Sequence, residues 1–170
     1  SGTIVFTTNG GVDWTDATTT NVGVNNMNDV SMSDASNGVA VGTSGTIVFT
    51  TDGGDTWTDA TTTNVGVNNM LGVSMSDASN GVAVGTSGAI VYTSDGGDTW
   101  TDATTTNVAA SKMYGVSMSD ASNGVAVGNS GQIVYTSDGG DTWTDATTTN
   151  VAASKMYGVS MSDASNGVAV

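Results

Sequence analysis

The sequence has no cysteine, histidine, arginine, glutamate or proline. The absence of cysteine excludes disulfides and thiolate metal ligands. The absence of both histidine and cysteine removes the nucleophile–base pairs on which most hydrolases depend. These missing residue types argue against most catalytic functions before any motif is considered.

Positive charge is nearly absent, because Lys112 and Lys155 are the only cations against sixteen aspartates, for a formal net charge of -14. Such a chain repels nucleic-acid phosphates and anionic lipid, so we expect neither as a partner. The apolar runs are only a few residues long, so membrane insertion is not expected. A surface rich in Thr, Ser, Asn and Gly with little Lys is typical of secreted or virion-surface proteins. The chain does not begin with Met, as expected of a processed product, a fragment or an engineered protein.

What the sequence does contain is an internal repeat of 43 residues. The units align without gaps at 1–43, 44–86, 87–129 and 130–170, and the last is two residues short. The third and fourth units differ over their shared length only at Ala89 and Gln132. The first two share TTTNVGVNNM where the last two have TTTNVAASKM, which indicates stepwise duplication or design. We therefore treat residues 1–170 as a single repeat domain.

Each unit is predicted to contain four short strands. In the second unit these are Thr46–Thr50, Thr56–Ala60, Leu71–Ser76 and Val82–Val84, in which apolar residues alternate with period two. The intervening DGGD and DASNG segments are turn signals. Four strands in a period of 40 to 45 residues are typical of the blade of a β-propeller.

A recurrent motif gives a family resemblance. The segments Thr50–Trp57, Thr93–Trp100 and Thr136–Trp143 match the Asp-box pattern S/T-x-D-x-G-x-T-W. In the first unit, Asn9 and Asp13 replace the Asp and Thr of the box. The whole unit resembles the repeats of photosystem II assembly/stability-factor-like propellers, and it is similar to other Asp-box propellers such as sialidases and sortilin-type receptors. The resemblance implies an all-β propeller of four-stranded antiparallel blades, with the box in the hairpin between the third and fourth strands.

With the box in that hairpin, the repeat is out of phase with the blade. The chain then begins at a third strand, near Thr3–Thr7, and ends on a second strand, Val168–Val170. The terminal half-blades are expected to complete one blade, which would remove a sheet edge. Three assemblies remain open: a closed four-bladed ring, two chains forming an eight-bladed ring, and a longer open array. The two-chain ring and the open array both predict self-association, as a dimer or a larger assembly. A β-solenoid is the alternative fold.

We expect the Asp-box residues to be structural. Asp accepts hydrogen bonds from the backbone of its own turn, Gly supplies positive φ, and Trp packs between sheets. The resemblance also implies that the box lies far from any active site. The residues concerned are Asp52, Gly54, Thr56, Trp57, Asp95, Gly97, Thr99, Trp100, Asp138, Gly140, Thr142, Trp143, Asn9, Gly11 and Trp14.

Calcium is the alternative role for the DGGD turns, and no other metal or cofactor is expected. Two carboxylates fall within each turn, and hard cations bind several oxygen ligands. The turns lack the spaced ligands and bidentate Glu of an EF-hand loop, so we expect weak binding at most. The candidate ligands are Asp52, Asp55, Asp95, Asp98, Asp138 and Asp141.

The repetition also bears on function, because the aspartates of the Asp-box recur in the second, third and fourth units, so none is expected to have a distinctive environment. We therefore predict a non-catalytic structural or interaction propeller with a protein or carbohydrate ligand. One alternative is a multivalent carbohydrate-binding module with a weak site in each blade, where Tyr114 and Tyr157 stack on sugars if they are exposed. The remote alternative is an Asp-box glycosidase, although sialidases need an arginine cluster that this chain lacks.

Overall fold

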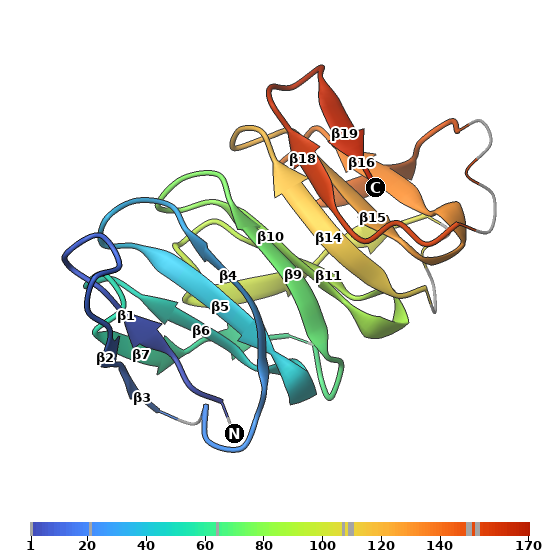
Figure 1. Cartoon of the computed structure of the whole chain (residues 1–170). Coiled ribbons are helices and arrows are strands. Elements are labelled where there is room, and N and C mark those ends of the chain that lie inside the picture. Colours follow the sequence, from blue (N-terminus) through green and yellow to red (C-terminus); the bar gives the residue numbers. More distant parts are fainter. Residues whose placement is uncertain are drawn as a thin grey trace.

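The computed structural model describes residues 2–20, 22–63, 65–106, 108, 111–148, 151 and 154–170, and almost all of its regular structure is β-strand. The strands form three five-stranded sheets and two two-stranded sheets, arranged one after another in an arc (Figure 1). Each large sheet is a meander of four antiparallel strands with a short parallel strand at its outer edge. The all-β propeller architecture predicted from the repeat is confirmed.

The large sheets are called blades one, two and three. Blade one consists of β4 (Met27–Met32), β5 (Gly38–Gly42), β6 (Ile47–Thr50) and β7 (Thr56–Asp59). Blade two consists of β9 (Met70–Met75), β10 (Gly81–Gly85), β11 (Ile90–Thr93) and β12 (Thr99–Asp102). Blade three consists of β14 (Met113–Met118), β15 (Gly124–Gly128), β16 (Ile133–Thr136) and β17 (Thr142–Asp145). The first strand of each blade lies innermost and the fourth outermost.

The two small sheets are half-blades. The N-terminal half-blade pairs β1 (Val5–Phe6) with β2 (Thr15–Asp16), which correspond to the two outer strands of a blade. The C-terminal half-blade pairs β18 (Val159–Met161) with β19 (Gly167–Ala169), which correspond to the two inner strands. Among the described residues these are separate sheets at the two ends of the arc, so a closed ring is not formed within the chain.

The segment between consecutive blades covers an outer sheet edge. The short strands β3 (Thr18–Thr19), β8 (Thr61–Thr62) and β13 (Thr104–Thr105) pair in parallel with the outermost strands β7, β12 and β17. This pairing satisfies an edge that would otherwise be open to another chain. Between the second and third strands, the 3₁₀ turns are η1 (Thr43–Gly45), η2 (Thr86–Gly88) and η3 (Asn129–Gly131). No helix in the described part of the chain has the length and apolar character needed to cross a membrane.

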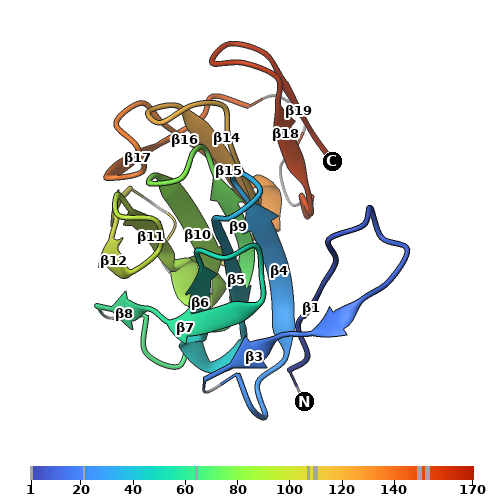
Figure 2. The same ribbon diagram turned by 90° about the vertical axis from the view of Figure 1, so that its left-hand side faces the viewer.

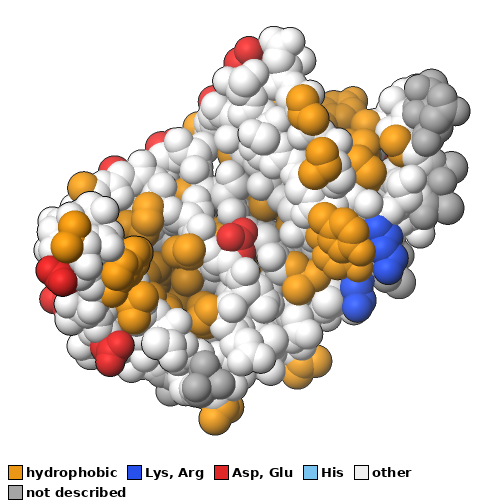
Figure 3. Space-filling view, viewed as in Figure 1, with side chains coloured by type: hydrophobic (Ala, Val, Ile, Leu, Met, Phe, Trp, Pro, Cys, Tyr) orange, Lys and Arg blue, Asp and Glu red, His pale blue; other side chains and the backbone are white. Residues whose placement is uncertain are grey.

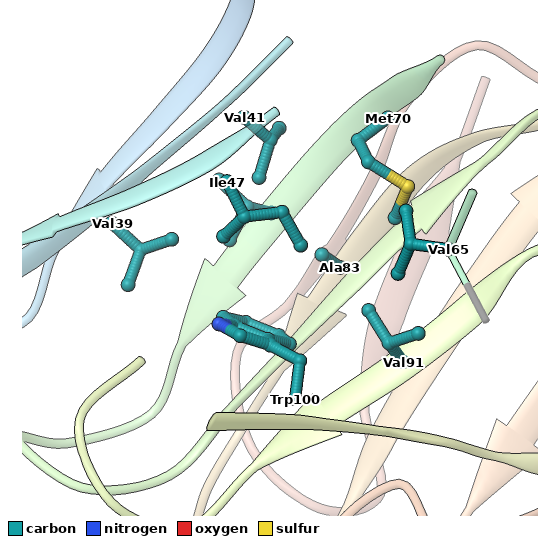
Figure 4. Close-up of a cluster of buried hydrophobic side chains, with 9 residues drawn as sticks. Val39, Val41, Ile47, Val65, Met70, Ala83, Val91 and Trp100 are labelled. Atoms are coloured by element: carbon teal, nitrogen blue, oxygen red, sulfur yellow. The ribbon is translucent and has the colours of Figure 1, made fainter. Parts of the chain in front are cut away.

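The second strand of each blade explains how both faces of a sheet are buried. In β10, Val82 and Val84 face blade three, whereas Ala83 faces blade one. Trp100 lies on the same side as Ala83, in a cluster that Val39, Val41 and Ile47 complete from blade one (Figure 4). The small alanine leaves room for the indole ring. Burying such a ring removes about 150–250 Å² from water, or roughly 4–6 kcal/mol before entropy is subtracted.

Neighbouring blades approach most closely at their innermost strands (Figure 2). A Cβ on Gly72 would lie 3.0 Å from the carbonyl oxygen of Tyr114, so a side chain there would push blades two and three apart. Serines also link these strands, because the backbone N–H of Met118 donates to Ser74 Oγ in the preceding blade at 3.0 Å. The equivalent bonds run from Met75 to Ser31 and from Met161 to Ser117.

Candidate functional site

The Asp-box of blade two forms a closed set of hydrogen bonds within its own hairpin. Asp95 Oδ1 accepts from the Thr93 hydroxyl at 2.8 Å and from the Thr99 backbone N–H at 2.9 Å. The Thr93 hydroxyl oxygen accepts from the Gly97 N–H at 3.0 Å, and the Trp100 indole N–H donates to the Gly97 carbonyl at 2.9 Å. The carboxylate therefore fixes the turn that places the indole in the core. Asp52 and Asp138 make the same contacts in blades one and three.

The box carboxylates are held in their charged form by these contacts. The hydroxyl of Thr56, followed by its backbone N–H, lowers the pKa of Asp52 from 3.8 to about 2. The pKa of Asp138 is lowered in the same way by Thr142. Burial opposes the shift at Asp95, but hydrogen bonds from Thr99 leave its pKa lowered. A carboxylate with a lowered pKa and its acceptor sites already in use is poorly suited to act as a general acid at neutral pH.

The first unit keeps this hydrogen-bond pattern with donor and acceptor exchanged. Asn9 Oδ1 accepts from the Thr7 hydroxyl and from the Asp13 N–H, both at 3.0 Å. Asn9 Nδ2 then donates to Asp13 Oδ2 at 2.8 Å, where in blade one the Thr56 hydroxyl donates to Asp52 Oδ2. The Trp14 indole still donates to the Gly11 carbonyl, at 3.1 Å. Asn9 and Asp13 are thus a paired substitution, and the turn they form is equivalent to the others.

The DGGD turns offer two carboxylates each. Within the ranges that the structure describes, no three carboxylates come together in a group that would hold a metal ion. The backbone carbonyl of Asp98 is engaged by the Thr61 N–H at 2.7 Å, and that of Asp141 by the Thr104 N–H at 2.7 Å. These turns therefore bind the linker that covers the outer edge of the blade.

Asp29 departs from the repeat, because the other three units have glycine at its position. Its Oδ2 accepts from the Val73 N–H of blade two at 2.9 Å, across the interface between inner strands. The preceding Asn28 donates from Nδ2 to the Met70 carbonyl at 2.7 Å. Sequence reasoning missed both residues, although alignment of MNDV with MLGV and MYGV marks them as exceptions.

The two lysines and two of the tyrosines gather where the inner strands begin, in what we call the rim patch: Lys112, Tyr114, Lys155 and Tyr157. The rings of Tyr114 and Tyr157 lie 5.0 Å apart between centroids, tilted by 39°. They contact each other because the repeat gives them equivalent positions beside adjacent inner strands, with Tyr114 within β14 and Tyr157 two residues before β18. Tyr157 is 61% exposed and both lysines are exposed. Figure 3 shows the lysines side by side at the edge of an apolar surface.

The rim patch is confined to the last two units. Units one and two carry Asn26 and Asn69 at the lysine positions, and Asn28 and Leu71 at the tyrosine positions. The patch is therefore one localised surface that combines apolar rings with positive charge on a strongly acidic chain. The connections at 104–112 and 147–155, which lead into the patch, lie in part outside the described residues.

Comparison with known proteins agrees with this geometry. The family model described as photosynthesis system II assembly factor YCF48 matches residues 12–100 and 60–147. The solved structure "YCF48 bound to D1 peptide" is 25% identical, with a TM-score of 0.66 over 76% of this chain and 42% of that one. YCF48 from Cyanidioschyzon merolae is 17% identical, with a TM-score of 0.72 over 99% of this chain and 60% of that one.

An ancestral GH74 enzyme is 13% identical, with a TM-score of 0.63 over 81% of this chain and 20% of that one, and this likeness concerns the fold alone. No curated protein sequence matches the chain. The chain spans less than two thirds of each of the YCF48 structures that it resembles.

Proposed function

Because the chain belongs to the family of the photosystem II assembly factor YCF48, we propose that it is a non-catalytic propeller that binds an extended segment of a partner protein. The observation that carries the proposal is the rim patch, the one place where the two cations adjoin stacked aromatic rings. The relative bound to a peptide supports a protein ligand rather than a small substrate.

The chemistry of the patch defines the segment that fits it. The exposed ring of Tyr157, which contacts the half-buried Tyr114, offers an apolar surface and a hydroxyl group at low conformational cost. The ammonium groups of Lys112 and Lys155 attract a carboxylate on the segment. We therefore propose a peptide in which an acidic side chain or a terminal carboxylate lies next to an apolar side chain.

The Asp-box residues have a structural role in this proposal. In each box of blades one to three, the carboxylate accepts hydrogen bonds from its own turn, and the tryptophan is buried between sheets. The calcium alternative has only pairs of turn carboxylates to support it. The glycosidase alternative would need two carboxylates with distinct environments, and the boxes of the three blades are equivalent.

The carbohydrate alternative predicts a comparable surface on every blade. The tyrosine pair and the lysines occur only on blade three and the C-terminal half-blade, so they favour one site over four. A single directional site suits a partner protein better than a repeating glycan. A glycan array probed in parallel with peptides distinguishes the two, because strong glycan hits that survive loss of the rim patch would favour the carbohydrate module.

The test is an array of random 12-residue peptides probed with the purified chain. The variant Lys112→Asn combined with Lys155→Asn carries the residue that units one and two have at this position. Its affinity for the peptides that bind the starting chain should be at least tenfold lower. Arginine at both positions should keep most binding, and Asn26→Ser in unit one is the matched control that should change nothing. Because the contact is partly electrostatic, raising the salt concentration should also weaken it. Peptide binding that is indifferent to the lysines and to Tyr157→Asn would contradict the proposed site.

A further inference from the structure

A long groove lies between the N-terminal half-blade and blade one, and we call it the end groove. It has a volume of about 700 Å³ and is lined by Phe6 and Trp14 on one side and by Val30, Met32 and Trp57 on the other. Figure 3 shows apolar side chains gathered in a hollow over β1 and β4. In the single chain this hydrophobic surface is exposed to water, which is unfavourable. Exposed apolar surfaces of this kind typically mark sites where another molecule binds.

The repeat identifies what is missing from the end groove. A Cβ built on Gly97 would lie 2.7 Å from Val39 Cγ2, and one on Gly140 would lie 2.6 Å from Val82 Cγ2. At Gly54, the third equivalent, Phe6 has the only described side chain within 3.5 Å of such a Cβ. The valine that covers the box glycine in the other two interfaces is absent here. At the same position of the repeat, the fourth unit carries Val168.

Both surfaces of the missing interface are present at opposite ends of the arc. Val30 is 56% exposed at the end groove, whereas its equivalent Val73 is 6% exposed between blades one and two. Val168 is 70% exposed on β19, whereas its equivalent Val82 is fully buried. Each end thus exposes the apolar face that the other end would cover.

The backbone edges match as well. In blade two, β10 pairs with β11 so that Val82 lies opposite Tyr92 and Val84 opposite Ile90. The same register places Val168 opposite Phe6 and Val170 opposite Ile4, joining β19 to β1 as a four-stranded blade. It also brings Ser160 to the position from which Ser31, Ser74 and Ser117 accept an N–H of the next inner strand, the donor being Met32.

We infer that the end groove binds the β18–β19 hairpin of a second copy of this chain. The chain superposes over 99% of its length on 60% of YCF48 from Cyanidioschyzon merolae, so its blades follow the curvature of part of a larger ring. Closure of one chain on itself would require a sharper angle at every interface, including the tight contact of Gly72 with Tyr114. A second copy fills the groove without such a change, and reciprocal exchange fills both grooves of a two-chain ring.

The first test uses the absence of cysteine. Phe6→Cys and Val168→Cys are introduced in separate chains, which are mixed and mildly oxidised, because opposed residues on antiparallel strands lie within reach of a disulfide. We expect a covalent species of twice the 16.8 kDa chain mass. Phe6→Cys mixed with Ala169→Cys is the control, since Ala169 faces the opposite side of the strand. A single chain that carries both Phe6→Cys and Val168→Cys tests self-closure. If it forms an internal disulfide as a monomer, the groove is filled by the chain's own hairpin and the inference is wrong.

The second test measures association by sedimentation equilibrium. Val168→Asp with Val170→Asp places charge on residues that are already exposed in the single chain, so folding should be unaffected while association weakens at least 100-fold. Val67→Asp, at a valine that is 88% exposed in the segment between blades one and two, is the control and should change the dissociation constant less than about twofold. Association should strengthen with salt, because two chains of net charge -14 repel one another. The inference is supported if the wild-type chain forms a dimer or an open array and the Val168→Asp, Val170→Asp variant does not. It is overturned if the wild-type chain is monomeric or if this variant associates as the wild-type chain does. Neither outcome depends on the rim patch.

Discussion

The exchanged donor and acceptor in the first unit lead to a specific prediction about blade two. Replacing Asp95 by Asn and Thr99 by Asp reproduces there the arrangement of Asn9 and Asp13. Each single substitution should destabilise the chain, and the double substitution should recover most of the loss. The physical reason is that Thr99→Asp alone sets two carboxylates, both acceptors, against each other, whereas the paired change sets an amide donor against a carboxylate, as at Asn9 and Asp13.

The magnitudes follow from the contacts of the box. Asp95→Asn keeps the oxygen that accepts from Thr93 and from the Thr99 N–H, but it loses the charge that strengthens those bonds, at a cost of about 1 kcal/mol. Thr99→Asp removes a hydroxyl donor and brings a second carboxylate against Asp95. Repulsion at this partly screened site adds to the lost hydrogen bond, for about 2–3 kcal/mol in total. The double variant should lie within about 1 kcal/mol of the starting chain.

Urea denaturation of the four proteins measures the coupling between the two positions. A coupling free energy of about 2 kcal/mol corresponds to a displacement of roughly 1 M in the urea midpoint. The cycle cancels the low strand propensity of aspartate, because Thr99→Asp appears with and without its partner. Strictly additive effects would refute the argument that Asn9 and Asp13 form a compensating pair.

Two further predictions concern stability. Asn129 Oδ1 is buried with no hydrogen-bond partner among the described residues, so Asn129→Thr, which restores the residue of units one and two, should raise the free energy of unfolding by about 1 kcal/mol in urea titrations. The native pKa of Asp52 is lowered to about 2, so the stabilisation from its contact with Thr56 is complete above the unfolded value of 3.8 and is lost as the pH falls toward 2. Thermal melting at pH 6, 4, 3 and 2 should show this loss, and Asp52→Asn should reduce its steepness; an equally steep loss in the variant would contradict the assignment.

Most of the fold could be predicted because the same local signals occur in every unit. The alternation in the GVAVG segment and the DGGD turn each specify a strand or hairpin with no long-range information. The strand predicted at Leu71–Ser76 is found at Met70–Met75, and that at Thr56–Ala60 is found at Thr56–Asp59. The position of the terminal half-blades followed from the phase of the box within the hairpin.

The parallel strands β3, β8 and β13 could not be predicted in the same way. Each is only two residues long, and its partner lies 38 residues further along the chain, as Thr61 pairs with Thr99. The stacking of Tyr114 on Tyr157 also depends on how closely neighbouring inner strands approach, which periodicity within one unit does not reveal. The end groove is a property of the interface between blades, so it too became visible only in three dimensions.

The differences between units are a better guide to function than the features they share. A perfectly repeated residue creates the same surface on every blade, so it cannot direct a partner to one position on the arc. The buried apolar residues between blades are nearly identical, whereas the starts of the inner strands differ. There Asp29 replaces glycine in the first unit, and Lys112 and Lys155 replace asparagine in the last two. The two ends of the arc thus differ chemically, with a carboxylate that links the inner strands of blades one and two at one end and a cationic aromatic surface at the other. A partner protein would therefore meet a surface with direction, even though the fold beneath it is a repeat.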